Sequence, residues 1–139
     1  MDSLHNMPSK APSTKLNIAV VGLGRMGKRH AKTLMYRVPH ANLVAVCSND
    51  ETELKWAREF FKDSNIEVFA SFDQMIEKEG LQAVWVSTST NVHASMTTAC
   101  INKNLHVLCE KPVSQNLQEV WLRYISLCDI DVLTTITGS

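Results

Sequence analysis

Apolar and polar segments alternate along this 139-residue chain with the periods of strands and helices. Continuous apolar runs, typical of strands buried in a parallel sheet, occupy residues 16–21, 43–47, 66–69, 83–86 and 105–109. Segments with helical periodicity lie between them, over residues 26–37, 51–61, 71–79 and 92–102. We expect a last helix over residues 117–127 and a sixth strand over residues 130–136. This alternation predicts a series of βαβ units.

The order of these segments predicts an α/β fold, a Rossmann-type doubly wound parallel sheet covered on both faces. We expect a flexible N-terminal tail over residues 1–15, a single domain over residues 16–120 and a C-terminal tail over residues 121–139. Ligands of such sheets bind outside the carboxyl ends of the strands. The residues that directly follow strands are therefore the candidates for chemistry.

Composition narrows the classes of function. Hydrophobic residues make up 45% of the chain and charged residues 20%, which is typical of a globular protein. Lys and Arg (14) balance Asp and Glu (14), so no net charge favours nucleic acid or an anionic membrane. No apolar run is long enough to span a bilayer, and the N-terminus lacks the apolar core of a signal peptide. We expect a cytoplasmic protein that binds neither nucleic acid nor membrane.

The cysteines form no C-x-x-C pair. Their spacing indicates buried thiols in a reducing compartment rather than disulfides or a zinc site, and no other metal site is expected. These cysteines are Cys47, Cys100, Cys109 and Cys128.

A glycine-rich turn follows the first predicted strand. Residues 22–27 read G-L-G-R-M-G, the G-x-G-x-x-G pattern between a strand and a helix. Gly22 allows the tight turn, Gly24 leaves room for a pyrophosphate, and Gly27 lets the helix pack closely on the strand. Amide groups at the helix start, where Arg25 and Met26 stand, face the phosphates. A plain structural turn is the alternative, but the strand–turn–helix context favours a nucleotide-binding turn.

The residues after the second predicted strand bear on the choice of cofactor. Asp50 lies about 20 positions beyond the last glycine, where dinucleotide sites place a carboxylate on the ribose hydroxyls. Its competing and preferred role is the helix N-cap, in a capping box with Glu53. Ser48, directly after the strand, is neutral and does not repel a 2′-phosphate, which Arg25 or Lys28 could reach. We therefore expect NAD or NADP as cofactor, with weak discrimination between them.

Two further polar segments follow later strands. Residues 87–93 read S-T-S-T-N-V-H; their small hydroxyl side chains can hydrogen-bond a cofactor or cap the next helix, and different members can do either. His93, in the first turn of that helix, is a packing residue or a ligand contact. Lys111, after the fifth strand, can orient a hydroxyl substrate or shuttle its proton, unless it is merely solvated. Pro112 fixes the turn that follows.

These motifs together resemble the N-terminal domain of the glucose–fructose oxidoreductase, inositol dehydrogenase and MocA (Gfo/Idh/MocA) family. The glycine turn with His30 after it, residues 87–93 and the Glu-Lys-Pro sequence match in order and spacing, over about residues 16–120. The resemblance implies an NAD(P)-binding Rossmann domain of an oxidoreductase that acts on CH–OH groups of a sugar or polyol, most like inositol-type dehydrogenases. It implies that Lys111 is catalytic and touches the nicotinamide ribose. It implies cofactor contacts at Gly22, Gly24, Gly27, Ser87, Thr88, Asn91, His93 and Glu110.

The chain departs from the family pattern in two respects. Ser48 stands where the family commonly has an acidic residue, and residues 121–139 diverge from the usual sequence at the domain junction. The family continues into a second α/β domain that supplies most of the substrate pocket. We therefore expect a truncated form that binds a dinucleotide with little or no turnover and self-associates through the uncovered face. One alternative is a non-catalytic nucleotide-binding module. Another is an S-adenosylmethionine methyltransferase, but the Glu-Lys-Pro sequence argues against the methyltransferase.

Overall fold

A five-stranded parallel sheet organises the part of the chain that the computed structural model describes, residues 15–111. The strands are β1 (Leu16–Val21), β2 (Ala41–Cys47), β3 (Glu67–Phe69), β4 (Ala83–Val86) and β5 (His106–Cys109). They lie in the order β3-β2-β1-β4-β5, which is the order of a Rossmann sheet. The predicted fold class is therefore confirmed. The helix expected over residues 117–127, the strand expected over residues 130–136, and Cys128 lie outside the described residues.

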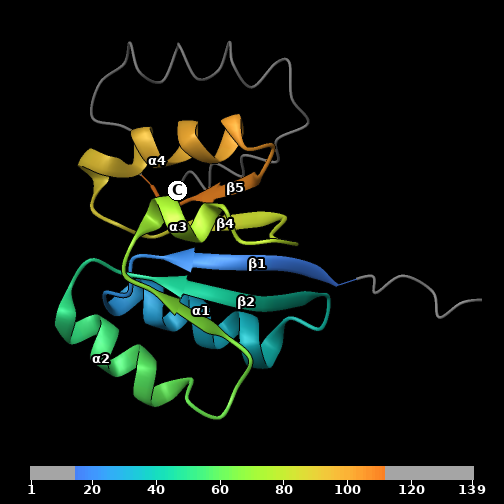
Figure 1. Cartoon of the computed structure of the whole chain (residues 1–139), viewed down its shortest axis with the longest axis vertical. Coiled ribbons are helices and arrows are strands. Elements are labelled where there is room, and N and C mark those ends of the chain that lie inside the picture. Colours follow the sequence, from blue (N-terminus) through green and yellow to red (C-terminus); the bar gives the residue numbers. More distant parts are fainter. Residues whose placement is uncertain (1–14, 112–139) are drawn as a thin grey trace, which may run out of the picture.

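Helices cover both faces of this sheet. They are α1 (Arg25–Arg37), α2 (Glu51–Phe60), α3 (Phe72–Ile76) and α4 (Thr90–Asn102). α1 and α2 lie on one face, and α3 and α4 lie on the other (Figure 1). The chain crosses from one face to the other between β3 and β4, so the strand order reverses beside β1. The carboxyl ends of β1 and β4 thus form the topological switch point at which ligands of open α/β sheets bind.

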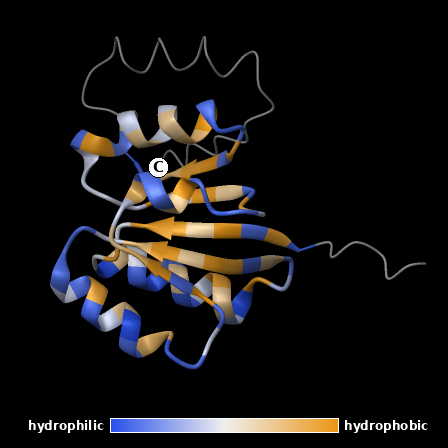
Figure 2. Ribbon diagram, viewed as in Figure 1, coloured by the Kyte–Doolittle hydropathy of each residue, from blue (hydrophilic) through white to orange (hydrophobic). Residues whose placement is uncertain are grey.

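Two apolar clusters hold the layers together. On one face Val21, Val86 and Val107 pack with Met75 of α3 and Cys100 of α4, all buried. The other face has its own cluster, in which residues of α1 and α2 pack on β1, β2 and β4: Ile18, Val20, Ala31, Leu34, Leu43, Val46, Ala57, Phe61 and Ala83. Figure 2 shows the strands apolar along most of their length and the helices of mixed character. Burial on both faces explains why the strands read as continuous apolar runs.

A register shift in β2 lets both faces be filled. Ile18 of β1 pairs with Leu43, but the next residue, Ala19, pairs with Ala45, so Val44 is an extra residue. Without the bulge, strict alternation would place Leu43 and Ala45 on one face. With it, Leu43 belongs to the cluster under α1 and α2 and Ala45 to the cluster under α3 and α4.

Most predicted element boundaries agree with the structure to within two residues, and α3 is the exception. The predicted helix over residues 71–79 is wrong in its second half, because α3 ends at Ile76. The backbone N–H groups of Glu77 and Lys78 bond three residues back, to Gln74 and Met75, so the helix tightens and stops. Gly80, with φ of 80°, belongs to the turn toward β4 rather than to the helix end.

No helix among residues 15–111 combines the length and apolar character that a membrane crossing needs. Of the cysteines in that range, Cys47, Cys100 and Cys109 are all free and buried, as predicted.

Candidate functional site

The glycine turn connects β1 to α1 by a close approach of backbone to backbone. Gly22 has φ of 87°, and a Cβ atom there would lie 2.5 Å from the carbonyl oxygen of Ser87. A Cβ atom on Gly27 would lie 1.7 Å from the carbonyl oxygen of Gly22. Only glycine fits at either position, which confirms the turn and packing roles predicted for these two residues.

The middle glycine of the turn has a different environment. A Cβ atom on Gly24 would meet its nearest neighbour, Glu53 Oε1, at 3.7 Å, which is ordinary contact. Gly24 is also the N-cap of α1, and as a glycine it provides no side-chain hydrogen bond to the helix start. The amide groups of the first turn of α1, which contains Arg25 and Met26, therefore face outward with the positive end of the helix dipole. Such a helix start binds anions.

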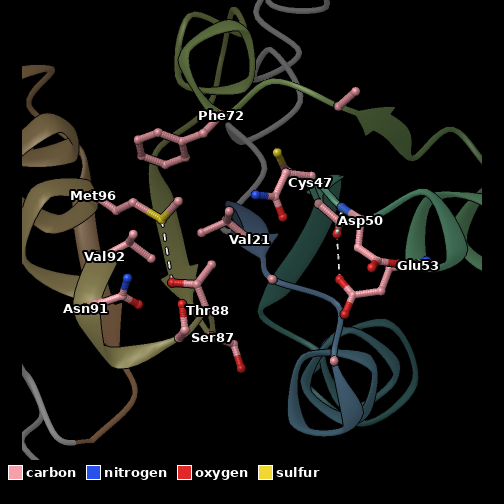
Figure 3. A pocket seen from close by; sticks show the side chains of 16 residues that line it. Val21, Cys47, Asp50, Glu53, Phe72, Ser87, Thr88, Asn91, Val92 and Met96 are labelled. Atoms are coloured by element: carbon pink, nitrogen blue, oxygen red, sulfur yellow. Dashed lines mark hydrogen bonds between the residues drawn. The ribbon is translucent and has the colours of Figure 1, made fainter.

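An open pocket of about 510 Å³ lies at the carboxyl ends of β1, β2 and β4. Its size is in the usual range of small-molecule sites. Figure 3 shows side chains from these three strand ends and from α4 converging on it. Many of the predicted cofactor-binding residues line the pocket: Gly22, Gly24, Ser48, Asp50, Ser87, Thr88 and Asn91. Apolar residues form another part of its wall: Val21, Ala70, Phe72, Val92 and Met96.

The other predicted site residues lie beside the pocket rather than in its wall. Arg25 and Met26 are exposed on the first turn of α1, and Gly27 is buried beneath that turn. Glu110 and Lys111 follow β5, farther along the same sheet edge. The remaining residue, His93, is buried below the loop after β4.

His93 holds that loop from within. Its side chain is 2% exposed, and Nε2 lies 2.6 Å from the carbonyl oxygen of Thr88, so the ring donates a hydrogen bond to it. The Thr88 hydroxyl in turn donates to Met96 Sδ at 3.6 Å, and the Ser87 N–H donates to the Val21 carbonyl at 2.8 Å. His93 therefore shapes the pocket wall through the backbone. Direct contact of His93 with a cofactor stays a prediction.

Asp50 is the N-cap of α2, as the preferred interpretation held. Its Oδ1 accepts a hydrogen bond from the Glu53 N–H at 3.0 Å, and this bond lowers the pKa of the Asp50 carboxyl. The reciprocal half of the predicted capping box does not form. The Asp50 N–H instead donates to Ser48 Oγ at 3.0 Å.

Glu53, which sequence reasoning placed only in the capping box, is part of the site. Its Oε2 accepts hydrogen bonds from the Leu23 N–H at 3.1 Å and from the buried Ser48 hydroxyl at 2.5 Å. The carboxylate thus lies against the glycine turn and in the pocket wall (Figure 3). A second acidic residue shortly after Asp50 was the available signal, but the capping pattern already explained it.

The end of β5 is tied to α1 by a polar pair. His30 Nε2 pairs with the carboxylate of Glu110, and the imidazole stacks on the Trp85 ring of β4, with centroids 4.1 Å apart. The Glu110 N–H also donates to the Val86 carbonyl at 2.9 Å. These contacts fix the position of the backbone that carries Lys111. Sequence reasoning noted His30 only as part of a motif.

Metal ligation has no support among residues 15–111, where no group of three or more His, Cys, Asp or Glu side chains is arranged to hold an ion.

Comparison with known proteins gives consistent matches. The model of a family described as an oxidoreductase family with an NAD-binding Rossmann fold matches residues 16–122. The myo-inositol 2-dehydrogenase of Thermotoga maritima is 36% identical over 105 residues, which are 76% of this chain and 30% of that protein. The inositol 2-dehydrogenase of Rubrobacter xylanophilus is 34% identical over 107 residues, 77% of this chain and 30% of that protein.

Solved structures agree with these sequence matches. The scyllo-inositol dehydrogenase of Lactobacillus casei, crystallised with NAD(H) and scyllo-inositol, superposes with a TM-score of 0.75 and 30% identity. The superposition covers 83% of this chain and 33% of that one. The chain thus spans about a third or less of the length of the relatives it matches.

Proposed function

We propose that this chain, which belongs to the Gfo/Idh/MocA family of oxidoreductases and contains its NAD-binding Rossmann domain, binds NAD(H) in the pocket at the carboxyl ends of β1, β2 and β4. The observation that carries the proposal is the start of α1, which has no side-chain cap at Gly24 and where a Cβ atom on that glycine would make no contact closer than 3.7 Å. A pyrophosphate fits there because outward amide groups and the helix dipole favour an anion.

The lining of the pocket suits the adenosine and nicotinamide parts of a dinucleotide. Polar groups after β2 suit the adenosine ribose, and the apolar side chains of Phe72, Val92 and Met96 suit a flat base. The nicotinamide end then extends along the sheet edge toward Glu110 and Lys111. We assign cofactor contacts to Gly22, Gly24 and the first amides of α1, with Ser87, Thr88 and Asn91 on the opposite wall.

NAD supplies hydride transfer when it is bound. The part of this chain in such a reaction is to hold the dinucleotide and to present Lys111 at the end of β5. A lysine at that edge can donate a hydrogen bond to a substrate hydroxyl and take part in moving its proton. The named substrates of the relatives, inositols, make a cyclic polyol the substrate class that we propose for the whole protein.

Isothermal titration calorimetry with NAD and NADH tests cofactor binding. We expect measurable binding to the wild-type chain. Gly24→Val should weaken that binding at least about 10-fold, because the branched side chain occupies the space assigned to the pyrophosphate. Unchanged affinity in a folded Gly24→Val variant would overturn this assignment of the site.

Turnover is the second property to measure. Catalysis draws about 7–11 kcal/mol from holding both reactants in a reactive geometry. Lys111 is the catalytic residue proposed here, and it provides only one side of such an arrangement. We expect these 139 residues to bind NAD yet produce little NADH from inositol, as a non-catalytic nucleotide-binding module would. Robust inositol-dependent NADH formation, lost in Lys111→Ala, would contradict this expectation and show an active enzyme.

A further inference from the structure

The Glu53 carboxylate lies in the pocket wall beside Ser48. The residue directly after β2, Ser48, has only a hydroxyl group. The backbone of Glu53 is in the first turn of α2, and its side chain reaches back to the glycine turn. Both hydrogen bonds that it accepts, from the Leu23 N–H and the Ser48 hydroxyl, go to Oε2. A carboxylate has about four lone-pair sites over its two oxygens. Among the described residues no donor bonds Oε1, which would lie 3.7 Å from a Cβ atom on Gly24, and Glu53 lines the pocket.

The two neighbouring candidates are already engaged. Ser48 Oγ donates its hydrogen to Glu53 and accepts the Asp50 N–H, and the side chain is 3% exposed. The Asp50 carboxylate accepts the Glu53 N–H at Oδ1 as the N-cap of α2, and it is also hydrogen-bonded by the backbone and side chain of Thr52. Glu53 is therefore the acidic group best placed to accept further hydrogen bonds at the end of β2.

We propose that Glu53 accepts the hydroxyl groups of the adenosine ribose and thereby selects NAD over NADP. The inference rests on the proposed binding of a dinucleotide in this pocket. A ribose 2′-hydroxyl donates a hydrogen bond to a carboxylate, whereas a 2′-phosphate would place like charges in contact. The hydrogen bonds from the Leu23 N–H and the Ser48 hydroxyl fix the direction of the Glu53 carboxylate. The weak discrimination expected from Ser48 alone is replaced by a preference for NAD.

The nearby cations do not reverse this preference. Arg25 and Lys28 line a separate hollow along the outer side of α1, and neither lines the pocket that contains Glu53. The Lys28 ammonium lies 4.9 Å from the centre of the Trp56 ring, which holds it against α2. Its attraction to Asp50 is the weakest contribution to the lowered pKa of that carboxyl.

Calorimetric titration of the full chain with NAD, NADP and an NAD analogue lacking the adenosine 2′-hydroxyl tests the proposal. The wild type should bind NAD at least about 10-fold more tightly than either of the other ligands. Glu53→Gln has the same shape and can still accept the Leu23 N–H, but carries no charge. It should weaken NAD binding about 10-fold and bring the NAD-to-NADP ratio close to one.

Glu51→Gln is the matched control. It removes the same charge two residues earlier in α2, where the Glu51 side chain is 83% exposed and pairs with Arg58 on the surface. The NAD-to-NADP ratio should be unchanged in this variant. Asp50→Asn tests the rival carboxylate, and it should change the ratio much less than Glu53→Gln does.

The outcomes separate the two proposals. If the wild type binds NAD, the 2′-deoxy analogue and NADP with equal affinity, the role of Glu53 is refuted and the proposed function survives. A ratio that responds to Asp50→Asn and not to Glu53→Gln also refutes that role. If the wild type binds none of the three dinucleotides, both proposals fail. The wild-type comparison of NAD with its 2′-deoxy analogue needs no variant to fold.

Discussion

Individual residues of the glycine turn have different surroundings, in line with the separate roles that the motif predicts for them. Gly27 is surrounded by backbone, and a methyl group there would overlap the carbonyl of Gly22. A Cβ atom on Gly24 would make only an ordinary contact with Glu53, and the φ of −65° at Gly24 is one that any L-residue can adopt. Gly27 is thus needed for the fold, whereas Gly24 leaves room for the ligand that we propose.

This difference predicts that an alanine substitution affects stability at Gly27 but ligand binding at Gly24. Gly27→Ala should destabilise the fold by more than about 3 kcal/mol, because the rigid backbone around it cannot move aside. Gly24→Ala should leave the melting temperature within a few degrees of wild type and still weaken NAD binding. Thermal unfolding followed by circular dichroism measures the first effect, and calorimetry measures the second. A Gly27→Ala variant as stable as wild type would contradict the close approach described here.

Sequence reasoning identifies the motif residues but not the direction of their side chains. His93 was placed correctly in the first turn of a helix, yet only the structure shows its ring buried and bonded to Thr88. Glu53 matched a capping pattern so well that its second role had no separate signal. Glu53 fits the local capping pattern and also accepts a hydrogen bond from Leu23, 30 residues away. Local sequence patterns do not reveal such a distant contact.

At the scale of elements, the start of α2 shows how a loop is fixed beside a site. Ser48 bonds the Asp50 N–H, Asp50 bonds the Glu53 N–H, and the Glu53 carboxylate returns to Ser48. The chain of bonds ties the end of β2 to the first turn of α2. It therefore holds the polar wall of the pocket in place before any ligand binds.

Removal of the Asp50 cap should destabilise α2 in a pH-dependent way. Asp50→Ala should lower the melting temperature by a few degrees near neutral pH, since it leaves the Glu53 N–H without its acceptor. The hydrogen bond lowers the pKa of the folded carboxyl, so its stabilisation is present above the ordinary pKa and is lost as pH falls through the lowered value. Melting curves of wild type and variant should therefore converge in acid. The exposed Asp63→Ala serves as control, and an equal effect at both positions would contradict the cap.

Element types were predictable because each buried strand and amphipathic helix carries its own period. The strands were expected where they are, and the helix starts were marked by the glycine turn, Asp50 and Ser71. Two features were not visible. The bulge at Val44 depends on the pairing of β2 with β1, and the early end of α3 depends on backbone bonds of its last turn. The bulge is thus set by a tertiary contact, whereas the end of α3 is set by the backbone geometry of one turn, and neither leaves a pattern of apolar and polar residues.

At the scale of the whole fold, the sheet and helices that form the pocket also bury the thiols of Cys47 and Cys100. Burial raises the pKa of Cys47 to about 11 and that of Cys100 to about 12, from 9.0 in each case. Cys47 stands at the end of β2, in the pocket wall, and Cys100 packs in the core beneath α4. Neither thiol ionises in the folded protein near neutral pH, which makes both poor nucleophiles there.

These pKa values predict a loss of stability in alkali. Above pH 9 the unfolded chain releases the thiol protons while the folded chain keeps them, so the free energy of unfolding falls as pH rises toward 11 or 12. The slope is up to about 1.4 kcal/mol per pH unit for each thiol. Urea unfolding under reducing conditions at pH 8, 9 and 10 measures it. Cys100→Ala should show a shallower slope than wild type above pH 9, and an identical slope would contradict the role of this thiol.

Binding of NAD over the glycine turn is tested most directly by nuclear magnetic resonance, because amide signals locate a ligand without any substitution. Titration of the ¹⁵N-labelled chain with NAD should shift the amides of Gly24, Arg25, Met26 and Thr88 most strongly. Those of Lys32 and Tyr36, on the outer side of α1, should stay in place. Shifts centred on the outer side of α1, or no shifts at millimolar NAD, would contradict the account.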